Sequence, residues 1–492
     1  MITKKFIKKE GCGMAGVGIQ LKKLVKDKSF FGGVKAFTFS SIVITGPLFL
    51  CILLLTVAQQ FLELTSTPYY ERELFLAGML YSFVFSQIIT SGFIMVGTRY
   101  LADQIYENKE ENILSSLYGM IAVTVVIGGV IGAVFFLLSP LDFMFKLVAY
   151  LFLIELIIIW GLMMYISALK YYKQIIMGFL VGVLSSIAAI WVCYVAFDYL
   201  TATHLIICVN IGFLLLMLFF INSIKKRFPI NNEQYFNFLT YFSKYPSLFF
   251  VGLFYTFGLF IHAFMIWGSD LQMIVSDTYV MAPLFDVPFF YAFLTILPAM
   301  IIFVLTVETA FYNKYKSFYD KVIGSSSYQE IQNAHMKMFN VLSKEIVFIM
   351  EFQLFFTVCA IAIGTSLLPI TVEQVDIFNI VTVGNYFFII MFVVMQILLY
   401  FDDRKGALIV ISSYLLVSLI TAPITVLVGS YGLSCFISGL IGLVVAFGRL
   451  RYYCRNFGYF TYCAQPVEAK GHIIQEMARR LNTLNGFEGE KK

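Results

Sequence analysis

Residues 36–61 read AFTFSSIVITGPLFLCILLLTVAQQF and contain no charged side chain. An apolar stretch of about 20 residues is long enough to cross the hydrocarbon core of a bilayer, about 30 Å thick, as an α-helix. Eleven similar stretches follow along the chain: 74–98, 116–138, 146–169, 175–197, 203–222, 246–268, 282–308, 346–369, 377–400, 406–427 and 430–450. The sequence therefore predicts an all-α polytopic membrane protein with twelve transmembrane helices.

The overall composition supports this fold class and excludes several others. Hydrophobic residues make up 60% of the 492 residues and charged residues 13%, against about 45–50% and about 25% in soluble domains. The 11 Pro and 8 Cys are few, whereas Phe (53) and Tyr (30) are abundant. Collagen-like, disordered and disulfide-scaffold chains are therefore excluded.

The basic residues predict the orientation. If the twelve spans alternate, all of the 34 Lys and Arg residues except Arg72 and Lys146 fall on one side of the membrane. Because Lys and Arg mark the cytoplasmic side, both termini are expected there. The net charge of +5 reflects this bias, and we expect no nucleic-acid partner.

The spacing of the spans suggests how the chain is organised. A polar interruption after the sixth span divides it into two halves, and paired halves are common in transporters, where the substrate path runs between them. The expected parts are a basic amphipathic segment (1–35), an N-terminal six-helix bundle (36–222), a cytoplasmic linker (223–245), a C-terminal six-helix bundle (246–450) with a cytoplasmic loop (309–345), and a cytoplasmic tail (451–492).

Three cytoplasmic segments carry apolar residues at helical spacing, namely 17–25, 331–341 and 473–481. Such helices can lie among anionic lipid headgroups. Alternatively, their apolar faces are docking surfaces for a cytoplasmic partner. The pattern favours the lipid interpretation, which requires no partner protein.

Ionisable residues inside the spans are the candidate functional residues, because burying one at mid-membrane costs about 2.5–3.5 kcal/mol on insertion scales. The candidates for the substrate path or for ion coupling are Glu155, Asp286, His262, Glu351, Arg99 and Glu308. Each of them could instead be a packing residue with satisfied hydrogen bonds, or an anchor at the membrane interface.

Their positions suggest different roles. Glu155 is the strongest candidate, because it lies near the middle of the fourth span and cannot easily reach water. His262 and Asp286 lie at similar depth in consecutive spans and could pair near the outer side. Arg99 is expected to pair with Asp103, four residues further along the same helix.

The eighth span contains Pro283, Pro288 and Pro298. Proline removes a backbone donor and strains the preceding turn, and broken helices occur in membranes where they border a cavity or packed protein. The run Phe285–Pro288 combines such a break with a carboxylate and is the best local indication of a pathway. The glycine pairs Gly128–Gly132 and Gly178–Gly182 predict close helix packing.

No motif indicates catalysis or a cofactor. The chain has no P-loop, no GxGxxG fingerprint and no HExxH motif. It has no CxxC motif, and none of its cysteines falls in a predicted outer loop. We therefore expect no enzyme activity, no cofactor, no metal site and no disulfide.

Several stretches resemble the PelG family of exopolysaccharide transporters. They are Met14–Leu24, Ser41–Pro47, Thr98–Asp103, Ser167–Tyr172, Lys244–Pro246, Pro283–Pro288, Val307–Thr309, Phe318–Asp320 and Phe401–Gly406, in matching order over nearly the whole chain from Met14 onward. The family is similar to multidrug, oligosaccharidyl-lipid and polysaccharide flippases. This resemblance implies two six-helix bundles around a central cavity, in a bacterial cytoplasmic membrane.

The resemblance also implies a function and partners. It implies export of a growing Pel-like aminosugar polymer rich in N-acetylgalactosamine, together with a cytoplasmic glycosyltransferase and membrane scaffold subunits. Two alternatives stay open. One is an ion-coupled flippase of lipid-linked oligosaccharide, or a small-molecule exporter. The other is a non-conducting scaffold for a polysaccharide synthase.

Overall fold

The computed structural model describes residues 30–463 except 170, 198 and 325, together with Glu476, Arg480 and Asn482. Twelve helices in this part of the chain are long and apolar enough to cross a membrane, and they match the twelve predicted stretches one for one. The predicted spans are thereby confirmed. The amphipathic segments 17–25 and 473–481 lie outside the described residues, apart from Glu476 and Arg480.

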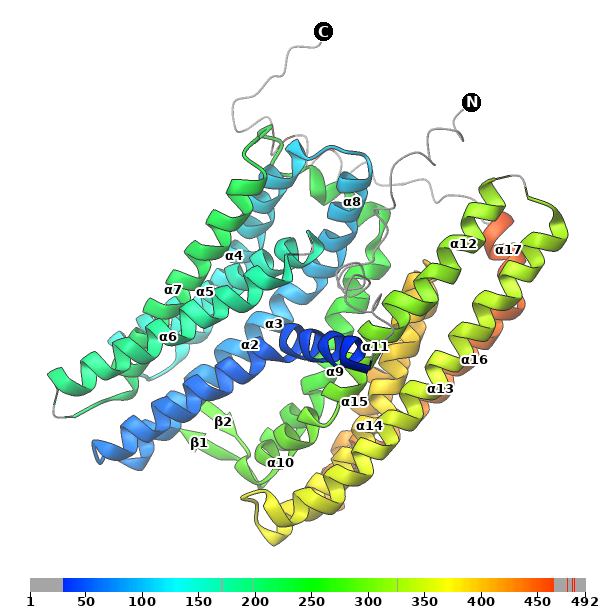
Figure 1. The fold of residues 1–492 in the computed structure, drawn as a ribbon. Coiled ribbons are helices and arrows are strands. Elements are labelled where there is room, and N and C mark those ends of the chain that lie inside the picture. The colour runs from blue at the N-terminus through cyan, green and yellow to red at the C-terminus, as the bar shows by residue number, and fades with distance from the viewer. Residues whose placement is uncertain are drawn as a thin grey trace.

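Helices make up nearly all of the structure (Figure 1). Their bounds are α2 (Phe30–Leu64), α3 (Tyr69–Tyr106), α4 (Glu111–Leu138), α5 (Phe143–Ala168), α6 (Tyr172–Ala196), α7 (Ala202–Arg227), α8 (Thr240–Lys244), α9 (Pro246–Trp267), α10 (Pro283–Leu294), α11 (Leu297–Thr306), α12 (Tyr312–Ile323), α13 (Tyr328–Leu367), α14 (Val372–Tyr400), α15 (Arg404–Leu427), α16 (Leu433–Arg455) and α17 (Phe457–Tyr462), with short turns η2 (Asn237–Leu239) and η3 (Val307–Phe311).

The first half, α2–α7, is held together where small residues let helix backbones approach. A Cβ added at Gly182 would lie 2.9 Å from Leu216, and one at Gly132 would lie 2.7 Å from Leu153. Only glycine leaves room for these neighbours, so the close packing predicted at the two glycine pairs is confirmed.

The second half, α9–α16, is built around α14. Apolar residues lie on all sides of this helix, and 72% of the residues in its 18-residue apolar stretch are buried. This is expected for a helix surrounded by others. Helices α10, α13, α15 and α16 pack against it. The two halves meet where α3 packs on α9 and where α11 packs on α2.

The eighth span is broken, although not where its carboxylate lies. Helix α10 continues through Pro288, and the break falls between Leu294 and Leu297, directly before Pro298. Gln353 of α13 satisfies the backbone at this break. Its amide nitrogen donates to the carbonyl of Thr295 at 2.8 Å, and its oxygen accepts from the N–H of Ala299 at 3.1 Å.

The region 309–345, predicted as the cytoplasmic connection between the eighth and ninth spans, is mostly helical. It contains most of η3, all of α12 and the first turns of α13. The apolar face of residues 331–341 was expected to lie on lipid, but it packs against protein. Ala334 and Met338 are buried against Phe318 and neighbouring side chains of the second half. The helical spacing of the apolar residues is confirmed, and their face is covered by protein.

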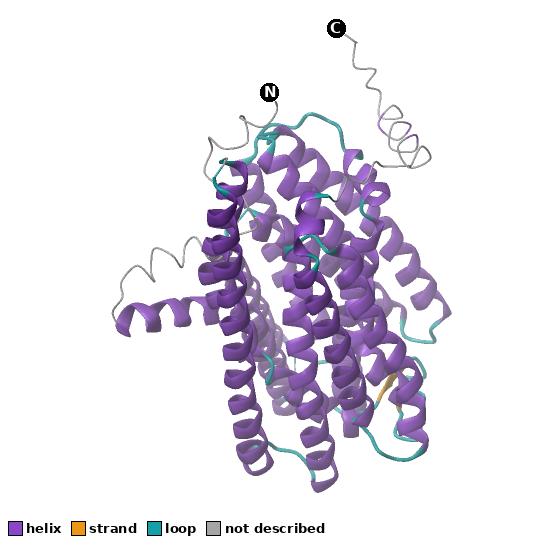
Figure 2. Ribbon diagram, turned by 90° about the vertical axis from the view of Figure 1, so that its right-hand side faces the viewer, coloured by secondary structure: helices purple, strands orange, loops and turns teal. Residues whose placement is uncertain are grey.

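A short antiparallel hairpin joins α9 to α10. Strand β1 (Met273–Val275) pairs with β2 (Tyr279–Met281), and Ser276 and Asp277 in the turn both have φ near +49°. Figure 2 shows the strands at the lower end of the helices. We call this the hairpin end of the molecule and the opposite end, which carries residues 228–245, the linker end.

Candidate gates between the two halves

The first contact between the halves lies at the hairpin end, around Tyr81 of α3. Its hydroxyl donates to the carbonyl of Val280 and accepts from the N–H of the same residue, both at 2.8 Å. Its ring stacks on Trp267 of α9, with centroids 5.3 Å apart, and meets the edge of Tyr279 at 4.8 Å. One side chain of the first half therefore holds both α9 and the hairpin.

Asp286 completes this group from the first turn of α10. Both carboxylate oxygens accept from Trp267 Nε1 at 3.0 Å, and Oδ2 also accepts from the N–H of Ala282 at 2.8 Å. Asp286 thus connects the end of α9 with the base of the hairpin. We call Tyr81, Trp267, Tyr279, Val280 and Asp286 the hairpin-end cluster.

The second contact lies at the linker end of the same helix. Arg99 forms ion pairs with Asp103 at 3.4 Å and with Asp402 at 3.8 Å. The predicted pair with Asp103 is confirmed. Asp402 lies in the turn between α14 and α15, where Arg404 pairs with it at 3.2 Å, so the pair with Arg99 joins the two halves.

Two tyrosines surround these charges. The ring of Tyr245 lies 5.4 Å from the guanidinium of Arg99 and 4.6 Å from that of Arg404. The hydroxyl of Tyr241 donates to Asp103 at 3.1 Å. Burial raises the pKa of Tyr241 and the negative charge of Asp103 raises it further, so this hydroxyl stays protonated. We call Arg99, Asp103, Tyr241, Tyr245, Asp402 and Arg404 the linker-end cluster.

Between the clusters α3 and α9 cross in backbone contact. A Cβ added at Gly92 would lie 2.6 Å from the Phe249 ring, and one at Gly252 would lie 2.5 Å from the carbonyl of Ser91. At 1.5 Å per residue, Tyr81 and Arg99 are about 27 Å apart along α3, which is close to the hydrocarbon thickness. One helix therefore carries two contacts with the second half, one toward each of its ends, and a tight crossing between them.

His262 does not pair with Asp286, so that expectation is wrong. His262 is buried inside the second half, where Nδ1 bonds to Ser434 Oγ at 2.9 Å and Nε2 to the Tyr414 hydroxyl at 3.2 Å. Helices α15 and α16 supply these partners, which makes His262 a satisfied interior residue of that half. Asp286 instead bonds to α9 and to the hairpin.

The remaining predicted residues lie apart from both clusters. Glu155 of α5 is half-buried, and its Oε2 is buried with no hydrogen-bond partner among the described residues. Glu351 is exposed on α13, beside Val347 and Phe348. Glu308 lies in the π-helical turn η3, and its side chain is outside the described part of the structure.

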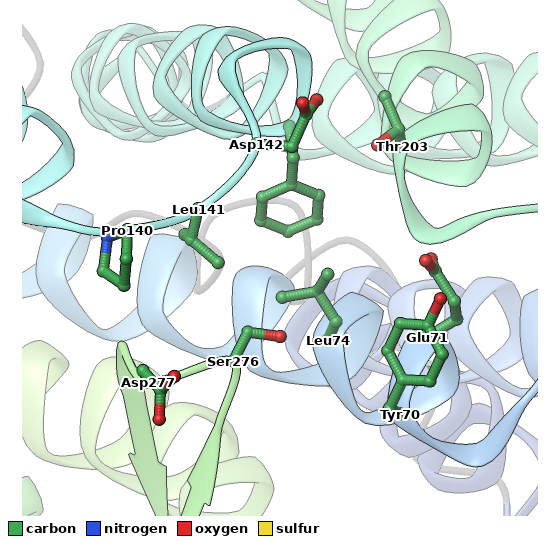
Figure 3. Close-up of a pocket in the computed structure, with 10 residues that line it drawn as sticks. Tyr70, Glu71, Leu74, Pro140, Leu141, Asp142, Thr203, Ser276 and Asp277 are labelled. Atoms are coloured by element: carbon green, nitrogen blue, oxygen red, sulfur yellow. The ribbon is translucent and has the colours of Figure 1, made fainter.

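A cavity of about 330 Å³ opens at the hairpin end of the first half (Figure 3). Glu71 accepts from the first N–H of α7, that of Ala202, at 2.7 Å, and Asp142 accepts from Met144 at the start of α5 at 2.9 Å. The turn of the hairpin supplies one wall through Ser276 and Asp277. The complete lining is Tyr70, Glu71, Leu74, Pro140, Leu141, Asp142, Phe145, Thr203, Ser276 and Asp277.

The chain matches a known protein family over most of its length. Residues 14–462 match PelG, a family whose description reads 'Putative exopolysaccharide Exporter (EPS-E)'. The chain belongs to the PelG family. The match begins at Met14, where the resemblance read from the sequence also begins, and it extends through α17.

The fold of this PelG-family chain is similar to that of solved MATE transporters. The eukaryotic MATE transporter AtDTX14 is 11% identical, with 91% of this chain and 98% of that chain covered and a TM-score of 0.51. The MATE transporter ClbM in complex with Rb+ is 12% identical, with coverages of 86% and 98% and a TM-score of 0.48. No curated protein sequence matches the chain.

Several residues that join the halves of this PelG-family chain were missed in the sequence. Tyr81, Trp267 and Tyr279 carry no charge, and aromatic residues are too frequent here to stand out, at 17% of the chain. Asp402 was part of a motif but had no predicted partner. Among the residues that join the halves, Arg99 and Asp286 were signalled in the sequence, by their charge at the end of a span and within a proline-rich span.

Proposed function

We propose that this protein exports a growing exopolysaccharide across the bacterial cytoplasmic membrane, along a path between its two halves. The linker end faces the cytoplasm in this proposal. Its support is that, among the described Lys and Arg residues, only Arg72 and Lys146 lie at the hairpin end. The polymer enters at the linker-end cluster and leaves at the hairpin-end cluster.

The observation that carries the proposal is that α3 contributes side chains to both clusters. Tyr81 belongs to the hairpin-end cluster, and Arg99 and Asp103 belong to the linker-end cluster. A path between the halves must be opened at each face, and α3 contacts the second half at both faces through side chains. The pair of Arg99 with Asp402 is partly exposed, and such ion pairs are worth about 0.2–1 kcal/mol. This contact is weak enough to break and re-form during transport.

The family match supports a proposal for the substrate and the partners. We propose a Pel-like aminosugar polymer, rich in N-acetylgalactosamine, delivered by a cytoplasmic glycosyltransferase that is bound with membrane scaffold subunits. The aromatic rings and charges of the linker-end cluster suit a hydroxylated sugar chain, since rings pack on sugar faces while charged groups bond to hydroxyls. Chain growth then supplies the driving force, or an ion gradient does so through Glu155.

The test is surface polymer in cells whose own gene is deleted and replaced by variants. Arg99→Gln and Asp402→Asn each remove the ion pair between the halves, and we expect polymer secretion to fall several-fold. Arg455→Gln is the matched control, because Arg455 is exposed at the same end and belongs to neither cluster. Protein level in the membrane fraction is measured for every variant.

The outcomes separate the alternatives. Normal secretion in both variants at normal protein level would remove the linker-end cluster from the path and favour the scaffold function. A flippase of lipid-linked oligosaccharide would act without the glycosyltransferase. Transport of lipid-linked oligosaccharide that persists when that enzyme is deleted would therefore favour the flippase.

A further inference from the structure

We propose that residues 273–281, the β1–β2 hairpin, are a movable strap that closes the hairpin end of the path, and that Asp286 is the residue that holds it closed. This inference rests on the proposed function, because it assigns one of the two gates.

The strap belongs to the second half along the chain but buries its side chains in the first. Tyr279 is 1% exposed and contacts the rings of Tyr81, Phe135 and Phe145. Burial raises the pKa of Tyr279, so its hydroxyl stays neutral among these aromatic side chains. The strap is covalently connected to the second half and packs against the first. It must therefore leave these contacts when the halves separate at this end.

Within the described part of the chain, the hydrogen bonds that join the strap to α3 all involve one hydroxyl, that of Tyr81. In the hairpin register Val280 faces Ile274, and its N–H and carbonyl both bond to Tyr81 rather than to β1. A two-stranded hairpin is marginally stable by itself. The strap can therefore be released without breaking any backbone ladder to another element.

Asp286 fixes the base of the strap. It accepts from the N–H of Ala282, directly after β2, and from the indole of Trp267, whose ring stacks on Tyr81. Among the described residues no basic side chain forms an ion pair with Asp286. A carboxylate held only by neutral donors is costly to bury, which fits a group retained to position the strap.

The experiment measures how often the strap opens in purified full-length protein in nanodiscs. Met281→Cys places a thiol on the buried face of the strap, at a position that is 6% exposed, and Ile274→Cys places one on its outer face, at a position that is 56% exposed. A membrane-impermeant maleimide is added, and the protein without either substitution gives the background from native cysteines. We expect Ile274→Cys to react quickly and Met281→Cys slowly.

Asp286→Asn is then added to each thiol variant. Loss of a hydrogen bond worth about 0.5–1.5 kcal/mol increases the open fraction about two- to twelvefold, so labelling of Met281→Cys should accelerate by that factor, while Ile274→Cys keeps its rate. Asp277→Asn is the matched control, because Asp277 lies in the turn of the same hairpin and far from its base. Tyr81→Phe should act like Asp286→Asn through the other attachment.

Three results would overturn the strap. They are fast labelling of Met281→Cys in the parent, equal effects of Asp286→Asn and Asp277→Asn, and no effect of either Asp286→Asn or Tyr81→Phe. If Asp286→Asn is poorly folded, Tyr81→Phe decides. Labelling requires no polymer, so the strap can fail while export stands, and the loss of polymer export as a function would leave the labelling result intact.

Discussion

Gln353 carries no charge and lies in the apolar part of α13, yet it supports the break of the eighth span. It is completely buried and bonds to Thr295 and Ala299 on either side of that break. Inside a membrane, freed backbone groups must find partners within the protein. A neutral amide side chain supplies an acceptor and a donor at the same place, which explains this residue type here.

We predict that Gln353→Leu destabilises the protein by about 2 kcal/mol, because it leaves a buried carbonyl and a buried N–H unpaired at about 1–3 kcal/mol each, with partial relaxation. The measurement is thermal unfolding in detergent. Gln332→Leu, at an exposed position of the same helix, should have almost no effect. Equal unfolding temperatures for the two variants would contradict this role.

Glu155 provides a second prediction at the residue scale. Its buried Oε2 has no partner among the described residues, so a purely structural role gives Glu155→Gln equal or higher stability. If Glu155 couples an ion to transport, as we propose, the same variant loses secretion at unchanged protein level. Surface polymer and unfolding temperature, measured together, separate the two roles, and normal secretion would exclude coupling.

Helices α6 and α7 form an antiparallel pair whose alignment is visible in its small and sulfur-containing side chains. The added Cβ of Gly182 meets Leu216, and further along the pair the thiols of Cys193 and Cys208 lie 3.4 Å apart. Side chains on a helix lean toward its N-terminus. In an antiparallel pair these two thiols therefore lean toward each other.

We predict that mild oxidation with copper phenanthroline joins Cys193 to Cys208 within one chain, because a disulfide requires only a modest approach from 3.4 Å to about 2.05 Å. Mass spectrometry of the digested protein identifies the linked peptides. Cys208→Ser is the control and should give no link. Failure to join the two thiols in the parent would show that the α6–α7 alignment is wrong.

At the scale of the whole molecule the charge bias and the alternating helices make one joint prediction about orientation. A thiol in the hairpin turn, Ser276→Cys, should react with an impermeant maleimide added to spheroplasts. A thiol on the part of α13 near the linker end, Asn333→Cys, should react only after the membrane is permeabilised. Both positions are exposed, so the reverse pattern would place the termini outside.

The apolar stretches alone determined the twelve spans and their alternation, because crossing a bilayer requires a run of apolar residues whatever the neighbours are. The resemblance gave the family. Even a local pair such as Arg99 with Asp103 was predictable, since residues four apart share a helix face.

Only the tertiary structure decided what those helices bring together. The sequence suggested that His262 and Asp286 could pair, but His262 bonds to α15 and α16, whereas Asp286 bonds to Trp267 and to the N–H of Ala282. The seat of Tyr279 and the pair of Arg99 with Asp402 join residues that are far apart in the chain. Depth in the membrane follows from sequence position, whereas helix rotation and the choice of neighbours are set by packing, and the two proposed gates depend on that packing.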